Sequence, residues 1–286
     1  MRIRASLAAA TVSGVVALTA LVAPAAQATD GPTPFTAKMS PFTATAPADD
    51  SQGDTQITKV TVNANTDVVV GVSTKSFNIY VTATDPAGID TAGAILWHGT
   101  SLSDTDPDVD GAMGSDQDAT CDQWSATSAT CKITITAEPG DSDTSTLYNS
   151  FLAGKWNVAA YAVGSDGDYV EKDVYKNSWV KRAASFSGFN ASPEPVTKGK
   201  AITVTGTLNR ASWTYLKYYG YGSQSVQLQF KKAGASTYST VKTITSSSSG
   251  YLKTTVTASV DGTYRFHYAG NSTSSVADAY DYVDVR

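Results

Sequence analysis

The chain has few of the residues on which enzymes most often depend. Its 286 residues include only two histidines, two cysteines and three methionines. No G-x-S-x-G motif is present. The histidines, His98 and His267, stand in unrelated parts of the sequence, and each lies in or at the end of a β-rich run. The sequence therefore predicts a protein that is not an enzyme and whose work is binding.

Long apolar runs are absent beyond the N-terminal segment. Segment 1–28 has Arg2 and Arg4, then an apolar run to Ala23, and an A-x-A motif at 26–28. This order is typical of a secretory signal peptide. No later stretch reaches the roughly 18 apolar residues that a membrane helix requires. We therefore expect a secreted, extracellular protein with no membrane partner.

Positive charge is scarce in the first part of the chain. Residues 29–182 hold 21 Asp and Glu against 9 Lys and Arg, a net charge of −12. Residues 183–286 hold 5 acidic and 10 basic residues, a net charge of +5. This asymmetry predicts a domain boundary near residue 182. The basic charges are few and scattered, so we expect no nucleic-acid partner.

Sustained helical periodicity is also missing, and short β-rich runs separated by turn residues take its place. Segment 144–154 alone roughly fits one face of a short helix, with a loop at a strand edge as the alternative. This pattern predicts an all-β fold of two tandem antiparallel β-sandwich (immunoglobulin-like) domains. The predicted parts are a signal peptide (1–28), a flexible arm (29–55), an acidic N-terminal β-sandwich (56–182) and a C-terminal immunoglobulin-like β-sandwich (183–286). The strands are predicted at 57–62, 67–72, 76–84, 93–98, 131–137, 156–164, 168–175, 178–182, 185–190, 201–208, 225–232, 238–245, 251–258, 262–270 and 279–285.

The two cysteines, Cys121 and Cys131, are close together in a chain that we expect to be exported. Such a pair predicts a disulfide. On the chain-entropy model, closing this short loop stabilises the fold by about 3 kcal/mol.

An acidic stretch at 103–122 has seven aspartates and neither lysine nor arginine. Within it, residues 106–111 read D-x-D-x-D-G, which is how a helix–loop–helix calcium site begins. Position 12 of that motif is Gln117 rather than an acid, and neither flank is an amphipathic helix, so an EF-hand is excluded. A calcium site in a β-loop, here the acidic loop 104–122, remains, with six candidate ligands: Asp104, Asp106, Asp108, Asp110, Asp116 and Asp118.

Two other interpretations of the acidic stretch stay open. It can be a solvated loop, because salt screens exposed carboxylates over about 8 Å, or it can be a surface for a partner. A second acidic segment, 165–173, has Asp166 and Asp168 on either side of a glycine. For that segment an ordinary turn is the favoured interpretation.

Aromatic residues gather in the loop 213–221, which suggests a second kind of binding. Flat rings with hydroxyl groups can stack on sugars, so a carbohydrate or cell-wall polysaccharide is an alternative ligand. The other interpretation is that the loop caps one end of a sandwich and buries part of these rings. The candidate stacking residues are Trp213, Tyr215, Tyr218, Tyr219 and Tyr221.

A third function is inhibition of an exported protease. The segment between Cys121 and Cys131, DQWSATSAT, would then be a tethered inhibitory loop, and the partner would be an extracellular protein.

Three segments carry a family resemblance: FNASPEPVTKGKAITVTGTLNRASW (189–213), YGYGSQSVQLQFKKAGASTYSTVKTI (219–244) and DGTYRFHYAGNSTSS (261–275). They resemble a module of secreted two-domain actinobacterial proteins with a C-terminal immunoglobulin-like module, usually labelled calcium-binding or hypothetical. The resemblance implies no catalysis and is consistent with an extracellular calcium-binding protein.

Overall fold

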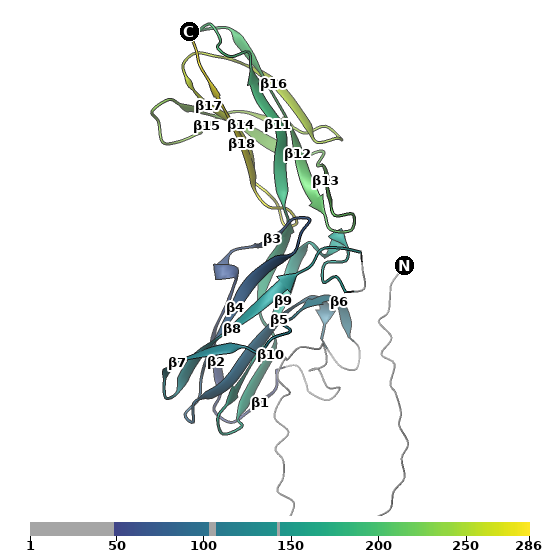
Figure 1. Ribbon diagram of the computed structural model, residues 1–286, viewed down its shortest axis with the longest axis vertical. Coiled ribbons are helices and arrows are strands. Elements are labelled where there is room, and N and C mark those ends of the chain that lie inside the picture. Colours follow the sequence, from purple (N-terminus) through teal and green to yellow (C-terminus); the bar gives the residue numbers. More distant parts are fainter. Residues whose placement is uncertain (1–48, 103–106, 142–143) are drawn as a thin grey trace, which may run out of the picture. The chain divides into compact units, whose positions relative to one another are not determined.

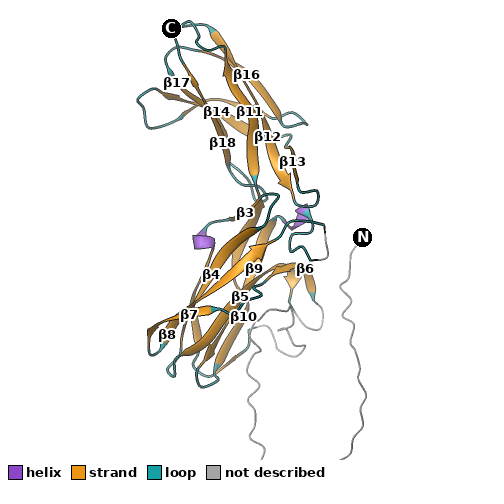
Figure 2. Cartoon of the chain, viewed as in Figure 1, coloured by secondary structure: helices purple, strands orange, loops and turns teal. Residues whose placement is uncertain are grey.

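The computed structural model describes residues 49–102, 107–141 and 144–286. The predicted signal peptide, most of the predicted arm, and both Asp104 and Asp106 lie outside the described residues. Strands dominate the described chain, with short 3-10 turns η1 (Asn63–Asn65) and η2 (Ser150–Leu152) between them (Figure 2). No helix of this part of the chain has the length and apolarity needed to cross a membrane.

Two sheets form the first sandwich, and the elements are labelled in Figure 1. One sheet has the order β1-β10-β9-β5-β6, with β3 added to β10, and the other has the order β2-β4-β8-β7. The strands are β1 (Ser51–Gln52), β2 (Gln56–Val62), β3 (Val68–Val70), β4 (Lys75–Thr84), β5 (Ile89–Ser101), β6 (Asp108–Met113), β7 (Thr120–Ser125), β8 (Ser128–Ala137), β9 (Gly154–Gly164) and β10 (Tyr169–Arg182).

The second sandwich also has two sheets. In one, β11-β12-β13 are in order and β16 pairs with β12; in the other the order is β15-β14-β17-β18. The strands are β11 (Ala184–Ser192), β12 (Ala201–Ser212), β13 (Lys217–Gly220), β14 (Ser225–Lys232), β15 (Ser239–Thr245), β16 (Tyr251–Thr257), β17 (Gly262–Tyr268) and β18 (Ala277–Val283).

Alternating apolar side chains build the two cores. In the first sandwich, Ile79 and Ile133 of one sheet and Leu96 and Val158 of the other belong to the same buried cluster. In the second, β17 buries every other residue, including Phe266, which packs in the second cluster. One buried and one exposed face follow from period-2 alternation. The predicted all-β sandwich fold is therefore confirmed, with the parallel pairing of β3 and β10 as an exception to its antiparallel order.

Four details differ from the sequence-based expectations. The segment 213–221, expected to be a loop, includes strand β13. The segments 168–175 and 178–182 are one strand, β10, which an irregularity in register between Lys172 and Lys176 interrupts. The acidic stretch, expected to be a loop, includes strands β6 and β7. The end of the predicted flexible arm is part of a sheet, because β1 pairs with Tyr169 and Val170 of β10.

The predicted disulfide is present. Cys121 of β7 and Cys131 of β8 are direct cross-strand partners and are joined by a bond of 2.02 Å. The segment between them is a β-hairpin, and Trp124 on its edge strand is 75% exposed.

Candidate metal centre

Two turns meet at one end of the first sandwich because of how the strands pair. Strand β5 is antiparallel to β9, and Ile89 at the start of β5 is opposite Gly164 at the end of β9. The turn that precedes β5 therefore lies beside the turn that follows β9. A backbone hydrogen bond of 2.9 Å from the Ser165 N–H to the Gly88 carbonyl joins the two turns directly.

These turns bring three carboxylates together: Asp85 from the first turn, and Asp166 and Asp168 from the second. One ligand oxygen of each lies within 4.8 Å of the others. We refer to these residues as the Asp triad. It is the one group of three or more acidic, histidine or cysteine side chains with this spacing in the described part of the chain.

Asp85 is the buried member of the triad, with 2% of its surface exposed. Its Oδ2 accepts a hydrogen bond of 2.5 Å from the Thr55 hydroxyl, and its Oδ1 accepts one of 2.7 Å from the Ala87 N–H. These donors are neutral, so they orient the carboxylate without balancing its charge. Burying an ionised carboxylate without an opposite charge is unfavourable.

The other two members are more accessible. Asp166 is exposed and Asp168 is half-buried. Asp166 Oδ1 accepts from the Asp168 N–H at 3.2 Å, and Asp168 Oδ2 accepts from the Asp54 N–H at 2.9 Å. Backbone donors thus fix both carboxylates in the tight turn at Gly167, whose φ of +93° is one that glycine tolerates.

Two glycines make room for this convergence. A Cβ at Gly164 would lie 2.6 Å from Oδ2 of Asp85 and 2.9 Å from Oδ1 of Asp166. A Cβ at Gly53 would overlap the carboxylate of Asp168. The carboxylates therefore occupy the space that side chains at these two positions would need.

Electrostatics favours a cation at the triad. Two unit negative charges 4.8 Å apart repel by roughly 3 kcal/mol at an effective dielectric constant of 20. Among the described residues, the ion pairs formed by Lys, Arg and His go to other acids and none reaches the triad. Oxygen-only ligands suit Ca²⁺ or Mg²⁺, whereas the softer transition metals favour sulfur or imidazole. The triad is thus an arrangement that could hold a hard divalent ion.

The predicted ligands of the acidic stretch have other neighbours. Asp108 Oδ2 accepts a hydrogen bond of 2.7 Å from the Thr100 hydroxyl, and Asp110 Oδ2 lies 3.2 Å from His98 Nδ1. Asp116 and Asp118 lie in the exposed loop after β6. None of these four residues belongs to a metal-type group among the described residues. Because Asp104 and Asp106 fall outside the described residues, calcium binding by the acidic stretch stays a prediction.

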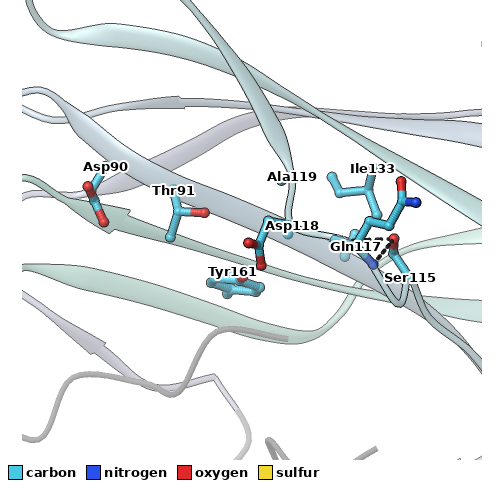
Figure 3. Close-up of a pocket in the computed structure, with 10 residues that line it drawn as sticks. Asp90, Thr91, Ser115, Gln117, Asp118, Ala119, Ile133 and Tyr161 are labelled. Atoms are coloured by element: carbon cyan, nitrogen blue, oxygen red, sulfur yellow. Dashed lines mark hydrogen bonds between the residues drawn. The ribbon is translucent and has the colours of Figure 1, made fainter. Parts of the chain in front are cut away.

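Asp118 instead lines a small pocket, shown in Figure 3. The pocket has a volume of about 210 Å³ and includes Asp90, Gln117 and the ring of Tyr161 in its wall. Ser115 and Gln117 hydrogen bond to each other at its rim. Most small-molecule sites have volumes of roughly 300–1,000 Å³, so this pocket is below the usual size.

The aromatic loop divides into a buried residue and exposed ones. Trp213 is fully buried, and its indole N–H donates to the Val70 carbonyl at 3.1 Å. It cannot stack on an external ligand, so its assignment as a stacking residue is wrong. Tyr215, Tyr218 and Tyr219 are 68%, 42% and 51% exposed. The fifth candidate, Tyr221, is half-buried, and the guanidinium carbon of Arg210 lies 3.8 Å from its ring centroid.

Sequence reasoning missed Asp85 and assigned Asp166 and Asp168 to an ordinary turn. Asp85 stands in DPAG, a common turn sequence, and no local pattern connects it with SDGD. A signal was nevertheless available. If the predicted strands 93–98 and 156–164 had been paired as neighbouring antiparallel strands, the acidic turn before the first and the one after the second would have come to the same end of the sheet.

Comparisons with known proteins identify no family. No family model matches the chain, and no curated protein matches it. Resembling solved structures include dimeric latent PorU from Porphyromonas gingivalis, at 11% identity over 81% of this chain and a TM-score of 0.27. The chain spans 20% of the length of PorU.

Two further solved structures are matched over nearly their whole lengths. The fibronectin(III)-like modules of Clostridium thermocellum CbhA match at 18% identity over 79% of this chain and 93% of theirs, with a TM-score of 0.28. A chimeric titin Z1Z2 tandem matches at 13% identity over 82% of this chain and 100% of its own, with a TM-score of 0.27. At these scores the likenesses carry no argument about function.

Proposed function

We propose that the protein is a secreted, non-catalytic binding protein whose first sandwich holds a calcium ion at the Asp triad. One observation carries the proposal: three carboxylates from two separate turns converge, one of them is buried, and no basic side chain of the described residues pairs with them. Extracellular calcium sites commonly work at dissociation constants of about 10⁻⁴ to 10⁻³ M, so a weak site is adequate, and backbone carbonyls and waters would complete the six to eight oxygen ligands that calcium takes.

The role of the ion would be to hold the two turns together. Asp85 belongs to the connection between β4 and β5, and the other two acids belong to the connection between β9 and β10. A shared cation replaces the repulsion between them with attraction. The folded state would bind calcium and the unfolded chain would not, so calcium should raise the free energy of unfolding by mass action.

The test is thermal unfolding of the full chain with and without millimolar calcium, together with isothermal titration calorimetry. At ten times the dissociation constant, the free energy of unfolding should rise by about 1.4 kcal/mol. Asp166→Asn should abolish both the heat of binding and this rise, because it removes one charge and keeps the acceptor for the Asp168 N–H. Magnesium in place of calcium shows which hard cation the triad prefers.

Two control variants distinguish calcium binding at the Asp triad from calcium binding at the acidic stretch. Asp141→Asn removes an exposed charge outside both the triad and the acidic stretch and should leave the calcium effect intact. Asp108→Asn tests the acidic stretch. If Asp108→Asn removes the calcium effect and Asp166→Asn does not, calcium binds to the acidic stretch and the triad proposal fails.

A second candidate function, carbohydrate binding, is favoured by the exposed tyrosines of the β12–β13 region. The rings of Tyr215 and Tyr219 meet edge to face with centroids 6.1 Å apart, and both are at least half exposed. Pull-down on chitin and cellulose, which carry no charge, should retain the wild-type protein and lose Tyr219→Ala. Equal retention of both would show that these tyrosines bind no glycan.

A further inference from the structure

The second sandwich presents a face that is polar and aromatic throughout. Along β14, β17 and β18, the residues that alternate with the core point away from it. We call this surface the polar face. Its residues are Gln227, Gln229, Lys231, Thr263, Arg265, His267, Asp278, Tyr280 and Tyr282, of which Gln229 is buried and the others are at least partly exposed.

The strand register arranges these residues in rows across the sheet. Gln229, Arg265 and Tyr280 are cross-strand partners in one row. Gln227, His267 and Asp278 form the next row, and Lys231, Thr263 and Tyr282 form the one on the other side. Neighbouring strands are about 4.8 Å apart, so each row spans roughly the width of one or two sugar rings.

Arg265 is held at the centre of the polar face by contacts on several sides. Its Nε donates to Gln229 Oε1 at 2.6 Å, and its Nη1 lies 3.7 Å from Asp278 Oδ1. The guanidinium carbon lies 4.0 Å from the centroid of the Tyr238 ring and 5.9 Å from that of Tyr280. The side chain is still 20% exposed. The side chain is therefore held on several sides while a fifth of it stays exposed.

The next row is ordered in the same way. His267 Nδ1 lies 2.8 Å from Asp278 Oδ1, and the two side chains are 24% and 26% exposed. Gln227 Oε1 accepts from Gln229 Nε2 at 2.6 Å and from the Thr240 hydroxyl at 3.3 Å. Side chains that are already ordered lose little conformational entropy when a ligand binds.

The composition of the face selects the kind of ligand. None of the nine residues of the polar face is aliphatic, whereas the buried centre of a protein–protein interface is usually more apolar. Tyr280 and Tyr282 are 54% and 49% exposed and offer ring faces beside directional hydrogen-bonding groups. Sugars need this combination, because their C–H faces stack on rings while their hydroxyls require polar partners.

The charge of the face indicates that the ligand is negatively charged. Lys231 and Arg265 are positive and Asp278 is the one acid among the nine residues of the face, so the surface has a net charge of +1. Guanidinium groups match carboxylates and phosphates in geometry. We propose that the polar face binds a polysaccharide that carries carboxylate or phosphate groups. This site is separate from the Asp triad and does not depend on calcium.

The experiment uses the full chain and measures binding to polygalacturonate by isothermal titration calorimetry at low and at high salt. Fully methyl-esterified polygalacturonate is the uncharged counterpart, and poly(glycerol phosphate) distinguishes phosphate from carboxylate. Binding to at least one of the two anionic polymers, weakening with salt and absent for the ester, is the expected result. Arg265→Gln should weaken it about tenfold, the size of one lost charged hydrogen bond, and Tyr280→Ala should also weaken it.

Matched controls lie on β16, in the other sheet of the same sandwich. Lys253→Gln removes a charge and Tyr251→Ala removes an exposed ring, and both variants should bind the anionic polymers like the wild type. Tyr219→Ala, which changes the other candidate glycan site, should also bind them like the wild type. Thermal unfolding verifies that each variant is folded. Three results would overturn the proposal. The first is no binding to either anionic polymer, and the second is equal binding by the wild type, Arg265→Gln and Tyr280→Ala. The third is equally tight binding to the methyl ester or to polyglutamate, an anionic polymer without sugar rings.

Discussion

Replacing Gly164 with alanine is a sensitive test of the Asp triad. The new Cβ would lie 2.6 Å from Oδ2 of Asp85, whereas ordinary contacts begin at 3.4 Å, so the carboxylate would have to retreat by about 0.8 Å. Asp85 is buried and held by Thr55 and by the Ala87 N–H, so it cannot retreat without weakening one of these hydrogen bonds. Such overpacking should lower the free energy of unfolding by about 1–3 kcal/mol.

The same change should also remove the response to calcium. Displacing one carboxylate by nearly an ångström takes it out of the shared coordination sphere, because calcium–oxygen distances vary by only a few tenths of an ångström, between about 2.3 and 2.6 Å. Urea unfolding, followed by tryptophan fluorescence with and without millimolar calcium, measures both effects. Gly164→Ala should be less stable than the wild type in the absence of calcium and should gain nothing when calcium is added.

Two other glycine substitutions test whether the effects of Gly164→Ala come from its clash with Asp85 rather than from a glycine-to-alanine change in general. A Cβ at Gly93 would meet the ring of Tyr161 and no carboxylate, so Gly93→Ala should lower stability but keep the calcium response. A Cβ at Gly114 would lie 3.5 Å from Ile95 Cγ2, an ordinary contact, so Gly114→Ala should change neither quantity. If Gly164→Ala has wild-type stability and a wild-type calcium response, the geometric argument for the triad is wrong.

Three further predictions concern stability. In urea unfolding, the double variant Cys121→Ser, Cys131→Ser should have a free energy of unfolding about 3 kcal/mol lower than the wild type, because the disulfide restricts the unfolded chain. An unchanged urea concentration at the unfolding midpoint would contradict this. Trp213→Ala should cost about 3–5 kcal/mol, since the side chain is fully buried, whereas Tyr215→Ala, at an exposed site, should stay within about 0.5 kcal/mol of the wild type. Burial raises the pKa of Tyr268 above its usual value of 10. Above pH 10 this tyrosine ionises in the unfolded chain before it ionises in the folded protein, so the stability that the shift contributes is complete below pH 10 and is lost at higher pH. Tyr268→Phe should therefore lose less stability than the wild type above pH 10.

Much of the fold was predictable because buried strands leave a period-2 pattern. In β14, Val226 and Leu228 alternate with Gln227 and Gln229, and the predicted strand 225–232 coincides with the observed one. Strand β6 was missed because its first half, beginning at Asp108, is exposed and has no apolar alternation. Strand β7 was missed for the same reason. Edge strands whose residues are mostly exposed give no such signal.

Irregular register explains another difference. Strand β10 was predicted as two strands because the irregularity between Lys172 and Lys176 disturbs its alternation. Trp213 shows a different limit. Its burial depends on a neighbour, Val70, that is remote in the sequence, and a Trp–Tyr cluster has the same local pattern whether its rings are buried or exposed.

The sequence by itself determined the all-β fold and the disulfide, because alternation and cysteine spacing are local properties of the chain. Only the tertiary structure decided which acidic side chains meet. The most acidic stretch supplies no metal-type group among the described residues, while three aspartates from two short turns converge. The physical reason is strand pairing: β5 beside β9 places Asp85 next to Asp166 and Asp168, and a contact between distant segments leaves no mark in either segment alone.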